Sequence, residues 1–326
     1  MKLLILYWRL LRYRVAVMMV LFMLLGAAWH QRLTTINGAI IAAIIALASS
    51  YVCATSVNDI ADRNIDAINL PNDPSRPLVT GAADVGQLWK LFSVASVLAI
   101  ALLLPINPMA AGIIVLSIAI GVLYSLPPIQ FSYRTFLAPL TLAVAYVGIP
   151  YWLGVAIVGD TIKASDLPLM AALYLLFTGR IILKDFRDRE GDATYGKPTF
   201  LLKYGKPATC LVSLLAICSG DILLIVTLAN RWWLAALLQL YVMGAIAMLY
   251  RLYRVSSRRD EQLSIGVAAK MGNGILTTLL GVLTLASYDA DWMMQLIFSL
   301  ALTAIYLINF IDFLRHPDQS IIGYKG

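Results

Sequence analysis

The chain of 326 residues is strongly apolar and carries few charges: 60% of its residues are hydrophobic and only 13% are charged. An average globular domain is roughly half apolar and roughly a quarter charged, so a soluble protein of this size would have too few charges to cover its surface. Intrinsic disorder is excluded as well, because it needs low hydrophobicity and high charge. We therefore expect an integral membrane protein, with residues 1–326 forming a single domain.

Apolar runs near the length needed to cross about 30 Å of hydrocarbon recur along the whole chain. They predict ten spans, at residues 15–30, 34–57, 87–104, 108–125, 136–158, 167–183, 208–228, 232–250, 271–288 and 292–313. The ninth run is the weakest, because Gly272, Asn273 and Gly274 dilute its start. The predicted fold class is an all-α polytopic membrane protein, a bundle of nine to ten transmembrane helices.

The net charge of +7 follows the predicted membrane topology and is not a signal for a nucleic-acid partner. With ten spans and a cytoplasmic N-terminus, 22 of the 25 Lys and Arg fall on the inner side, and only Arg32, Lys163 and Arg231 fall outside. Positive charge is retained on the cytoplasmic side of membrane proteins. This predicts a multi-pass protein of the cell or inner membrane with both termini inside. A nine-span topology, which moves only Arg315 and Lys325 outward, remains an alternative.

Acidic residues are concentrated in two short windows, 58–66 and 185–192, which hold seven of the 18 Asp and Glu of the chain. Within each window, oxygen-bearing side chains recur three or four residues apart, and such residues share one face of a helix. These residues are Asn58, Asp62 and Asp66 in the first window, and Asp185, Asp188 and Asp192 in the second. The windows follow the second and sixth spans on the cytoplasmic side, so the two acidic faces are expected to converge over a shared cavity.

Carboxylates stacked on one helix face repel each other by a few tenths of a kcal/mol per pair, and a divalent cation would compensate for this. Mg²⁺ prefers oxygen ligands and is typically held by one or two carboxylates together with the phosphates of a substrate. Arg and Lys complement phosphate oxygens, and several stand in or after the windows: Arg63, Arg76, Lys184, Arg187, Arg189, Lys197, Lys203 and Lys206. Each of these basic residues also fits the positive-inside bias with incidental salt bridges.

The two windows resemble the aspartate motifs of the UbiA superfamily of intramembrane prenyltransferases. Asn58–Asp66 (NDIADRNID) is similar to the NDxxDxxxD motif, and Asp185–Asp192 (DFRDREGD) is similar to DxxDxxxD, with its usual preceding Lys184. Arg76-Pro77-Leu78 and Tyr124-Ser125-Leu126-Pro127-Pro128 resemble further signatures of the family. Both motifs occur in the right spans and in the right order.

The resemblance implies a helical bundle around a central cavity, capped by two cytoplasmic motif loops. It also implies a Mg²⁺-dependent enzyme in the lipid bilayer that ionises an isoprenyl diphosphate and passes the allylic carbocation to a lipophilic or aromatic acceptor. By position, catalysis and metal binding fall to Asn58, Asp62, Asp66, Asp185, Asp188 and Asp192, with Asp59 as a further metal ligand. Substrate binding falls to Arg63, Arg76, Tyr124, Arg134, Lys184 and Lys197, of which Arg134 takes the place of a Lys that many relatives carry.

Two other functions remain open. A terpene cyclase of the same superfamily would use the same motifs and let the carbocation close on itself. A secondary transporter is the more remote alternative, because its carboxylates tend to lie near the membrane midplane and those of this chain cluster at span ends. A carbocation needs apolar and aromatic walls, for which the spans offer Tyr124, Phe131, Tyr133, Tyr146, Tyr151, Trp152, Tyr174 and Phe177. No residue identifies the acceptor.

Overall fold

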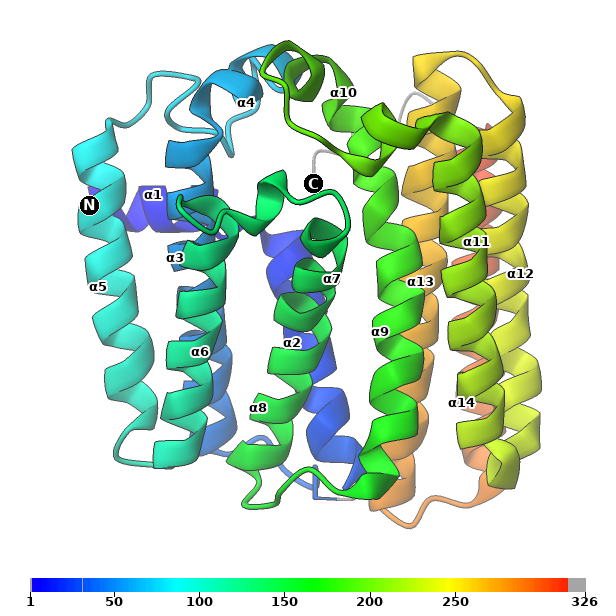
Figure 1. Cartoon of the computed structure of the whole chain (residues 1–326). Coiled ribbons are helices and arrows are strands. Elements are labelled where there is room, and N and C mark those ends of the chain that lie inside the picture. The colour runs from blue at the N-terminus through cyan, green and yellow to red at the C-terminus, as the bar shows by residue number, and fades with distance from the viewer. Residues whose placement is uncertain (1, 31, 316–326) are drawn as a thin grey trace.

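The computed structural model describes residues 2–30 and 32–315, which form helices and connecting loops without any strand. Figure 1 shows a bundle of long helices that run in alternating directions between two ends of the molecule. Within the described residues, nine helices are long and apolar enough to cross a membrane. The predicted all-α membrane fold is therefore confirmed.

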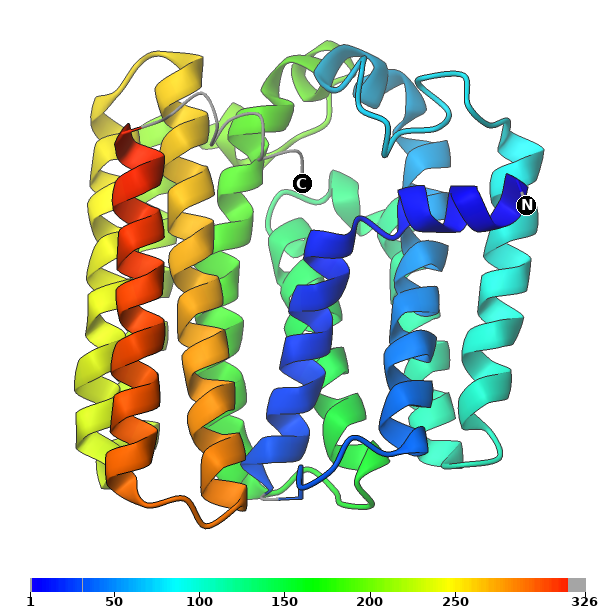
Figure 2. The same ribbon diagram turned by 180° about the vertical axis from the view of Figure 1, so that it is seen from behind.

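Most helices of the bundle lie where the apolar runs of the sequence predict spans. Its members are α2 (Tyr13–Trp29), α3 (Gly38–Ala61), α5 (Val85–Leu103), α6 (Pro108–Ser125), α7 (Leu137–Ala143), α8 (Ile149–Ile157), α9 (Leu167–Ile181), α11 (Phe200–Thr227), α12 (Trp232–Arg254), α13 (Arg258–Ser287) and α14 (Trp292–Arg315). A π-helical stretch, Val144–Gly148, joins α7 to α8 into one span. The central helices α3 and α13 are mostly buried, whereas α14 packs on the outside of α13 and is mostly exposed (Figure 2).

The N-terminal segment does not run straight into the membrane. α1 (Lys2–Leu10) lies across the bundle against α3 and α5 (Figures 1 and 2), and a bend of 68° separates it from α2. Arg12, at the bend, has φ 40° and ψ 62°, a left-handed conformation that costs a non-glycine residue roughly 1–2 kcal/mol. Its guanidinium pairs with the buried carboxylate of Asp59 on α3, which holds the bend in place. Counted as one span, the bent pair raises the number of possible spans to ten.

The eighth of these nine spanning helices, α13, begins well before the apolar run predicted at 271–288. Its first turn carries four charged residues, which lower the local hydropathy and hide the start of the helix from a sequence scan. Ser257 caps this N-terminus, because its hydroxyl accepts a hydrogen bond from the backbone N–H of Asp260 at 3.1 Å. Asp260 and Glu261 then complement the positive end of the helix dipole.

Glycines allow α2 and α8 to pack backbone against backbone. An ideal Cβ built at Gly154 would lie 1.8 Å from the carbonyl oxygen of Met23, and one built at Gly26 would lie 2.3 Å from that of Tyr151. Small residues at such crossings let membrane helices approach closely. Beyond this crossing, at the end of the bundle away from α4 and α10, the two ring nitrogens of His30 lie 2.9 and 2.8 Å from carboxylate oxygens that follow α8.

We expect Gly154→Ala to destabilise the folded protein by about 1–3 kcal/mol, because a side chain forced into this contact overpacks it. Gly112→Ala on α6 is the matched control, since an ideal Cβ there has no neighbour within 4 Å. Thermal unfolding of the purified variants in detergent measures the difference. Equal melting temperatures for the two variants would contradict the close packing of α2 on α8.

Candidate active site

The two acidic windows lie side by side at one end of the bundle, although they are far apart in the chain. The first occupies the end of α3 and the short helix α4 (Arg63–Asn69), and the second occupies α10 (Asp185–Thr194). Figure 1 shows α4 and α10 together above the ends of the spans. The backbone N–H of Gly191 donates to Asn69 Oδ1 at 2.7 Å across a sequence separation of 122 residues. The predicted convergence of the acidic faces is thus present.

In the first window α3 ends and α4 begins, but the backbone hydrogen bonds keep their spacing of four residues across the break. Asp62 ends α3 with φ −96° and ψ 12°. Its N–H still bonds to the carbonyl of Asn58 at 2.8 Å, and the N–H of Asp66 bonds to the carbonyl of Asp62 at 2.8 Å. Because this four-residue spacing is kept, Asn58, Asp62 and Asp66 all face the same cavity.

The second window continues the span of α9 through one tightened turn. α9 ends at Ile181, and a single 3₁₀ turn, Ile182–Lys184, leads into α10. Lys184, Asp188 and Asp192 line the cavity, whereas Asp185 faces a small adjoining pocket that Asp188 and Asp192 also border.

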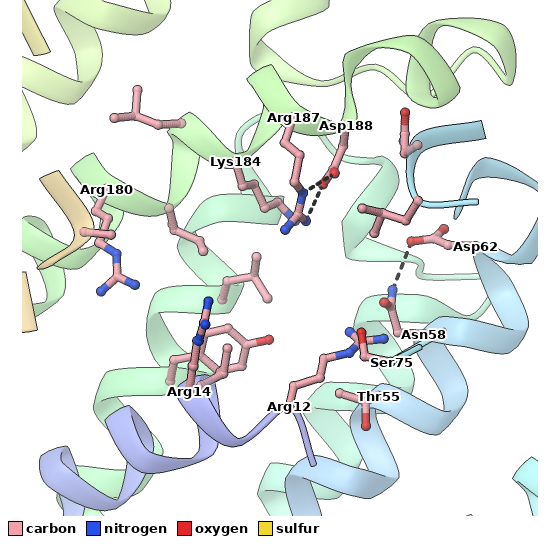
Figure 3. Close-up of a pocket in the computed structure, with 18 of the residues that line it drawn as sticks. Arg12, Arg14, Thr55, Asn58, Asp62, Ser75, Arg180, Lys184, Arg187 and Asp188 are labelled. Carbon is pink, nitrogen blue, oxygen red and sulfur yellow. Dashed lines mark hydrogen bonds and ion pairs between the residues drawn. The ribbon is translucent and has the colours of Figure 1, made fainter. Parts of the chain in front are cut away.

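The cavity has a volume of about 810 Å³, which is in the range of pockets that bind small molecules. Its upper part carries the side chains of both windows, and Figure 3 shows Lys184, Arg187 and Asp188 facing Asn58 and Asp62 across it. Much of the remaining wall is apolar and aromatic, formed by Tyr13, Val17, Tyr51, Ile120, Tyr124, Leu142, Ala145, Tyr146, Leu183, Ile265 and Phe313. Of the eight aromatic residues proposed from the sequence, only Tyr124 and Tyr146 line it.

Basic side chains pair with the acidic residues of both windows. Lys197 Nζ donates to Asp62 Oδ2 at 3.0 Å, and the amide of Asn58 donates to the same oxygen at 3.0 Å. Arg187 forms a two-pronged pair with Asp188, at 2.7 and 3.1 Å. These pairs offset the repulsion that stacked carboxylates would otherwise cause.

Around the first window, burial and neighbouring opposite charges shift the pKa values of the buried groups in opposite directions. Burial raises the pKa of Asp66 to about 7, although Arg76, whose Nη1 lies 2.9 Å from Asp66 Oδ2, opposes the rise. The nearby carboxylates of Asp59 and Asp62 raise this pKa further. Burial disfavours the charged form of Lys197, but Asp62 leaves the pKa of this ammonium above its ordinary value. The first window is thus a buried group of carboxylates that the surrounding cations hold in place.

The chemistry of the windows fits Mg²⁺ held jointly with a diphosphate. Asp62 Oδ1 is buried and has no hydrogen-bond partner within the described residues, so a hard oxygen ligand is available. Within residues 2–30 and 32–315, no three His, Cys, Asp or Glu side chains are close enough to hold a metal ion by themselves. The usual Mg²⁺ site combines one or two carboxylates with substrate phosphates and water.

Not every residue proposed from the sequence reaches the cavity. Arg76, Tyr124, Lys184 and Lys197 line it, together with Asn58, Asp62, Asp66, Asp188 and Asp192. The side chains of Arg63 and Arg134 are exposed to solvent outside it. Asp59 is buried behind the cavity wall, where it pairs with Arg12 and Arg76, so it positions these two cations.

Four further cations line the cavity, although the sequence did not assign them to the site. They are Arg12, Arg14, Arg180 and Lys270. All four lie at the ends of predicted spans that the positive-inside rule assigns to the cytoplasm, so the sequence already accounted for their charge. Only the helix packing shows that they face inward.

Residues 15–271 match the UbiA prenyltransferase family, and the chain belongs to this family. The predicted membership of the UbiA superfamily is thereby confirmed. Together with the helical bundle and the two motif helices, this match defines the class of the protein. It has the fold of an integral membrane prenyltransferase.

Among curated proteins, the chain is 30% identical over 176 residues to the chloroplastic chlorophyll synthase of Avena sativa, covering 50% of this chain and 45% of that protein. It is 29% identical over 220 residues to the digeranylgeranylglyceryl phosphate synthase of Methanospirillum hungatei, covering 66% and 74%. The chain thus spans about half the length of the chlorophyll synthases that it matches.

Solved structures share the fold. A UbiA homologue from Archaeoglobus fulgidus bound to GPP and Mg²⁺ superposes with a TM-score of 0.67 at 18% identity, covering 86% of this chain and 99% of that one. The same homologue bound to DMAPP and Mg²⁺ gives a TM-score of 0.65 at 18% identity, covering 83% and 99%.

We expect Gly191→Ala to separate the two motif helices, because an ideal Cβ there would lie 2.5 Å from the carbonyl oxygen of Ile65 and 2.7 Å from Asn69 Nδ2. Mg²⁺-dependent binding of a prenyl diphosphate should fall at least about tenfold, since a 1 Å misplacement in a site can cost a factor of about a hundred. Equilibrium binding of a radiolabelled donor measures this loss. Gly112→Ala serves as the control, and equal donor affinities would show that α4 and α10 need not touch.

Proposed function

We propose that this protein is a Mg²⁺-dependent prenyltransferase that moves an isoprenyl group from a prenyl diphosphate to a lipophilic or aromatic acceptor within the membrane. The observation that supports this most strongly is the meeting of two aspartate windows over one cavity with an apolar, aromatic wall. The names of the relatives agree with this proposal, because they include synthases that are named for prenylated products.

The proposed donor site combines the two windows with three cations. Asn58, Asp62, Asp66, Asp188 and Asp192 would hold Mg²⁺, which, when bound, neutralises charge developing on the leaving diphosphate. Asp185 borders the adjoining pocket and would complete this shell. Arg76, Lys184 and Lys197 would contact the diphosphate oxygens directly.

The walls would then protect the carbocation. The carbon–oxygen bond of the donor breaks, the electron pair leaves with the diphosphate, and the allylic cation stays in a region lined by Tyr51 and Tyr146. Aromatic faces attract cations, and the apolar wall excludes water that would otherwise capture the cation. Lys184 is held in place by a hydrogen bond of 3.1 Å to the hydroxyl of Tyr124. The acceptor adds to the cation, and its proton passes to the released diphosphate.

Variants that replace one carboxylate of each window with a neutral amide test the proposed metal site. Asp62→Asn and Asp188→Asn should each lower the rate of diphosphate release from geranyl, farnesyl or geranylgeranyl diphosphate by at least about a hundredfold, because each removes charge stabilisation of the leaving group. Chelation of Mg²⁺ with EDTA should have the same effect on the wild type. Chromatographic separation of a radiolabelled donor from its products provides the measurement, because this readout does not itself depend on Mg²⁺.

Glu190→Gln is the matched control, because Glu190 lies in the second window yet is exposed and paired with Arg258 at 2.7 Å. A surface ion pair contributes little, so this variant should stay within about twofold of the wild-type rate. Wild-type turnover by Asp62→Asn and Asp188→Asn together would rule out the metal assignment. Diphosphate release in the absence of any acceptor, with a cyclic product, would indicate the terpene cyclase instead.

We also propose that the motif end of the bundle faces the cytoplasm, with both termini on that side. The charge rule assigns most basic residues to the cytoplasmic side, and these residues lie near α1, α4, α10 and the α12–α13 connection. These elements share one end of the bundle in Figure 1, which supports the proposal. Carboxylates gathered at one end also disfavour the transporter, whose binding site would lie near the midplane.

Cysteine labelling in sealed inverted and right-side-out vesicles tests this orientation. Arg63→Cys on α4 and Lys163→Cys at the opposite end are both exposed positions. A membrane-impermeant maleimide should label Arg63→Cys only from the cytoplasmic side and Lys163→Cys only from the outer side. Labelling in the reverse pattern would overturn the proposed topology.

A further inference from the structure

One carboxylate outside the cavity is as deeply buried as most of those in the two windows. Glu261, in the first turn of α13, has only 3% of its surface exposed. It lies outside both the cavity and the small pocket beside it, so the donor site proposed above does not use it. A buried charge is costly unless partners pair with it. The partners of Glu261 come from two other helices.

Lys206 of α11 is the first partner. Its Nζ donates to Glu261 Oε1 at 2.8 Å, and it also donates to the backbone carbonyl of Val255, which follows α12. The same ammonium lies 6.0 Å from the centre of the ring of Phe186 on α10, at the outer range of a cation–π contact. One ammonium thus joins α11 to α13, to the α12–α13 connection and to α10.

A kink in α11 sets the direction of Lys206. Gly205 has φ 79° and ψ 175°, a conformation that is essentially restricted to glycine. Pro207 follows, and it lacks the backbone N–H that an unbroken helix would need. The Gly-Lys-Pro sequence therefore places the lysine at the kink, where its side chain reaches α13.

Arg189 of α10 lies near the other oxygen of the same carboxylate. Its Nη2 is 3.8 Å from Glu261 Oε2, an oxygen that is buried and makes no hydrogen bond among the described residues. Phe186 and Arg189 stand three residues apart and therefore share one face of α10. We call Phe186, Arg189, Lys206 and Glu261 the anchor cluster.

The anchor cluster meets α10 on a different face from the one that carries the aspartates. The face of Phe186 and Arg189 is turned by roughly 100° about the helix axis from the face of the three aspartates of the second window. α10 has only ten residues, too few to form a stable helix by itself. Contacts with its neighbours must therefore fix its rotation, and a rotation by one residue position would turn the aspartates away from the cavity.

Two further contacts hold α10, which packs against α4, α11 and α13. On the side of α4, the backbone of Gly191 bonds to Asn69. On the side of α13, Arg258 donates to Glu190 at 2.7 Å and to the carbonyl of Arg187 at 3.5 Å. This second contact is exposed, and exposed ion pairs contribute little. The buried anchor cluster is therefore the contact that fixes α10 against α11 and α13.

Resting on the proposed function, we propose that Glu261 is a positioning residue for the second window. Through Lys206 and Arg189 it holds α10 in the rotation that turns its aspartates toward the cavity. It touches neither the metal nor the diphosphate. Loss of the anchor cluster leaves a folded bundle whose second window binds Mg²⁺ and the donor poorly.

Two single variants with opposite changes of charge test this role. The readout is the Mg²⁺ concentration at which the full chain in detergent half-maximally binds radiolabelled geranylgeranyl thiodiphosphate, a slowly ionising donor analogue. Glu261→Gln removes a negative charge and Lys206→Met removes a positive one, so long-range electrostatics alone would move this concentration in opposite directions. Positioning predicts a rise of at least about tenfold in both variants, because residues that support metal ligands typically contribute a factor of about 10 to 100.

The double variant Lys206→Met/Glu261→Gln separates positioning from folding. It leaves neither half of the buried pair without its partner, so its melting temperature should exceed that of Lys206→Met. Its Mg²⁺ requirement should still lie at least about tenfold above that of the wild type, because α10 is still not held. Asp260→Asn is the matched control. Asp260 is the neighbouring acid of α13 and pairs with Arg251 of α12 at 2.9 Å, so the Mg²⁺ requirement of this variant should stay within about twofold.

Three results would overturn the inference and leave the proposed function intact. A Mg²⁺ requirement of the double variant within about twofold of the wild type would show that α10 needs no anchor cluster. Opposite shifts in the two single variants would assign the effect to long-range charge. An equal rise in Asp260→Asn would assign it to the start of α13 as a whole. A wild type that binds no donor analogue in the presence of Mg²⁺ would instead reject the proposed function and the positioning role together.

Discussion

The site depends on one contact, between the helices α4 and α10. Gly191 has no side chain, so its backbone can approach Ile65 and donate a hydrogen bond to Asn69. This contact brings two rows of carboxylates to one cavity, where they would repel each other strongly in a poorly hydrated environment. Neighbouring cations make the arrangement stable: Lys197, which follows the second window, pairs with Asp62 of the first window, and Arg187 pairs with Asp188 within the second window. Asp62 Oδ1, which is buried and has no hydrogen-bond partner among the described residues, stays available to a divalent cation.

The cavity has a charged upper end and an apolar, aromatic wall below it. Its upper end is highly charged, which suits the proposed diphosphate and metal, because both need strong electrostatic stabilisation as a carbon–oxygen bond breaks. Its walls below are apolar and aromatic, which suits the proposed carbocation, because such a cation must meet neither water nor a competing base. A polar head and an apolar body can then be bound by adjacent surfaces.

The surrounding bundle supports this site through a few contacts that fix helices relative to one another. The close approach at Gly154 joins α2 to α8, and the pairing of Arg12 with Asp59 connects the N-terminal bend to the first window. Asp59 therefore serves the site indirectly, since the same carboxylate also holds Arg76. The homologue from Archaeoglobus fulgidus keeps the same fold at 18% identity, which fits a fold defined by helix length and packing more than by particular apolar residues.

The amino-acid sequence by itself determined the membrane character, most of the spans and the two aspartate windows, because hydropathy and residue spacing are local properties of the chain. It also led to Arg76, Tyr124, Lys184 and Lys197, which line the cavity. Only the tertiary structure decided that Arg63 and Arg134 point to solvent, that Asp59 lies behind the wall, and that Arg14, Arg180 and Lys270 face inward. The physical reason is that a helix face becomes interior or exterior through its neighbours, and residues distant in sequence supply those neighbours.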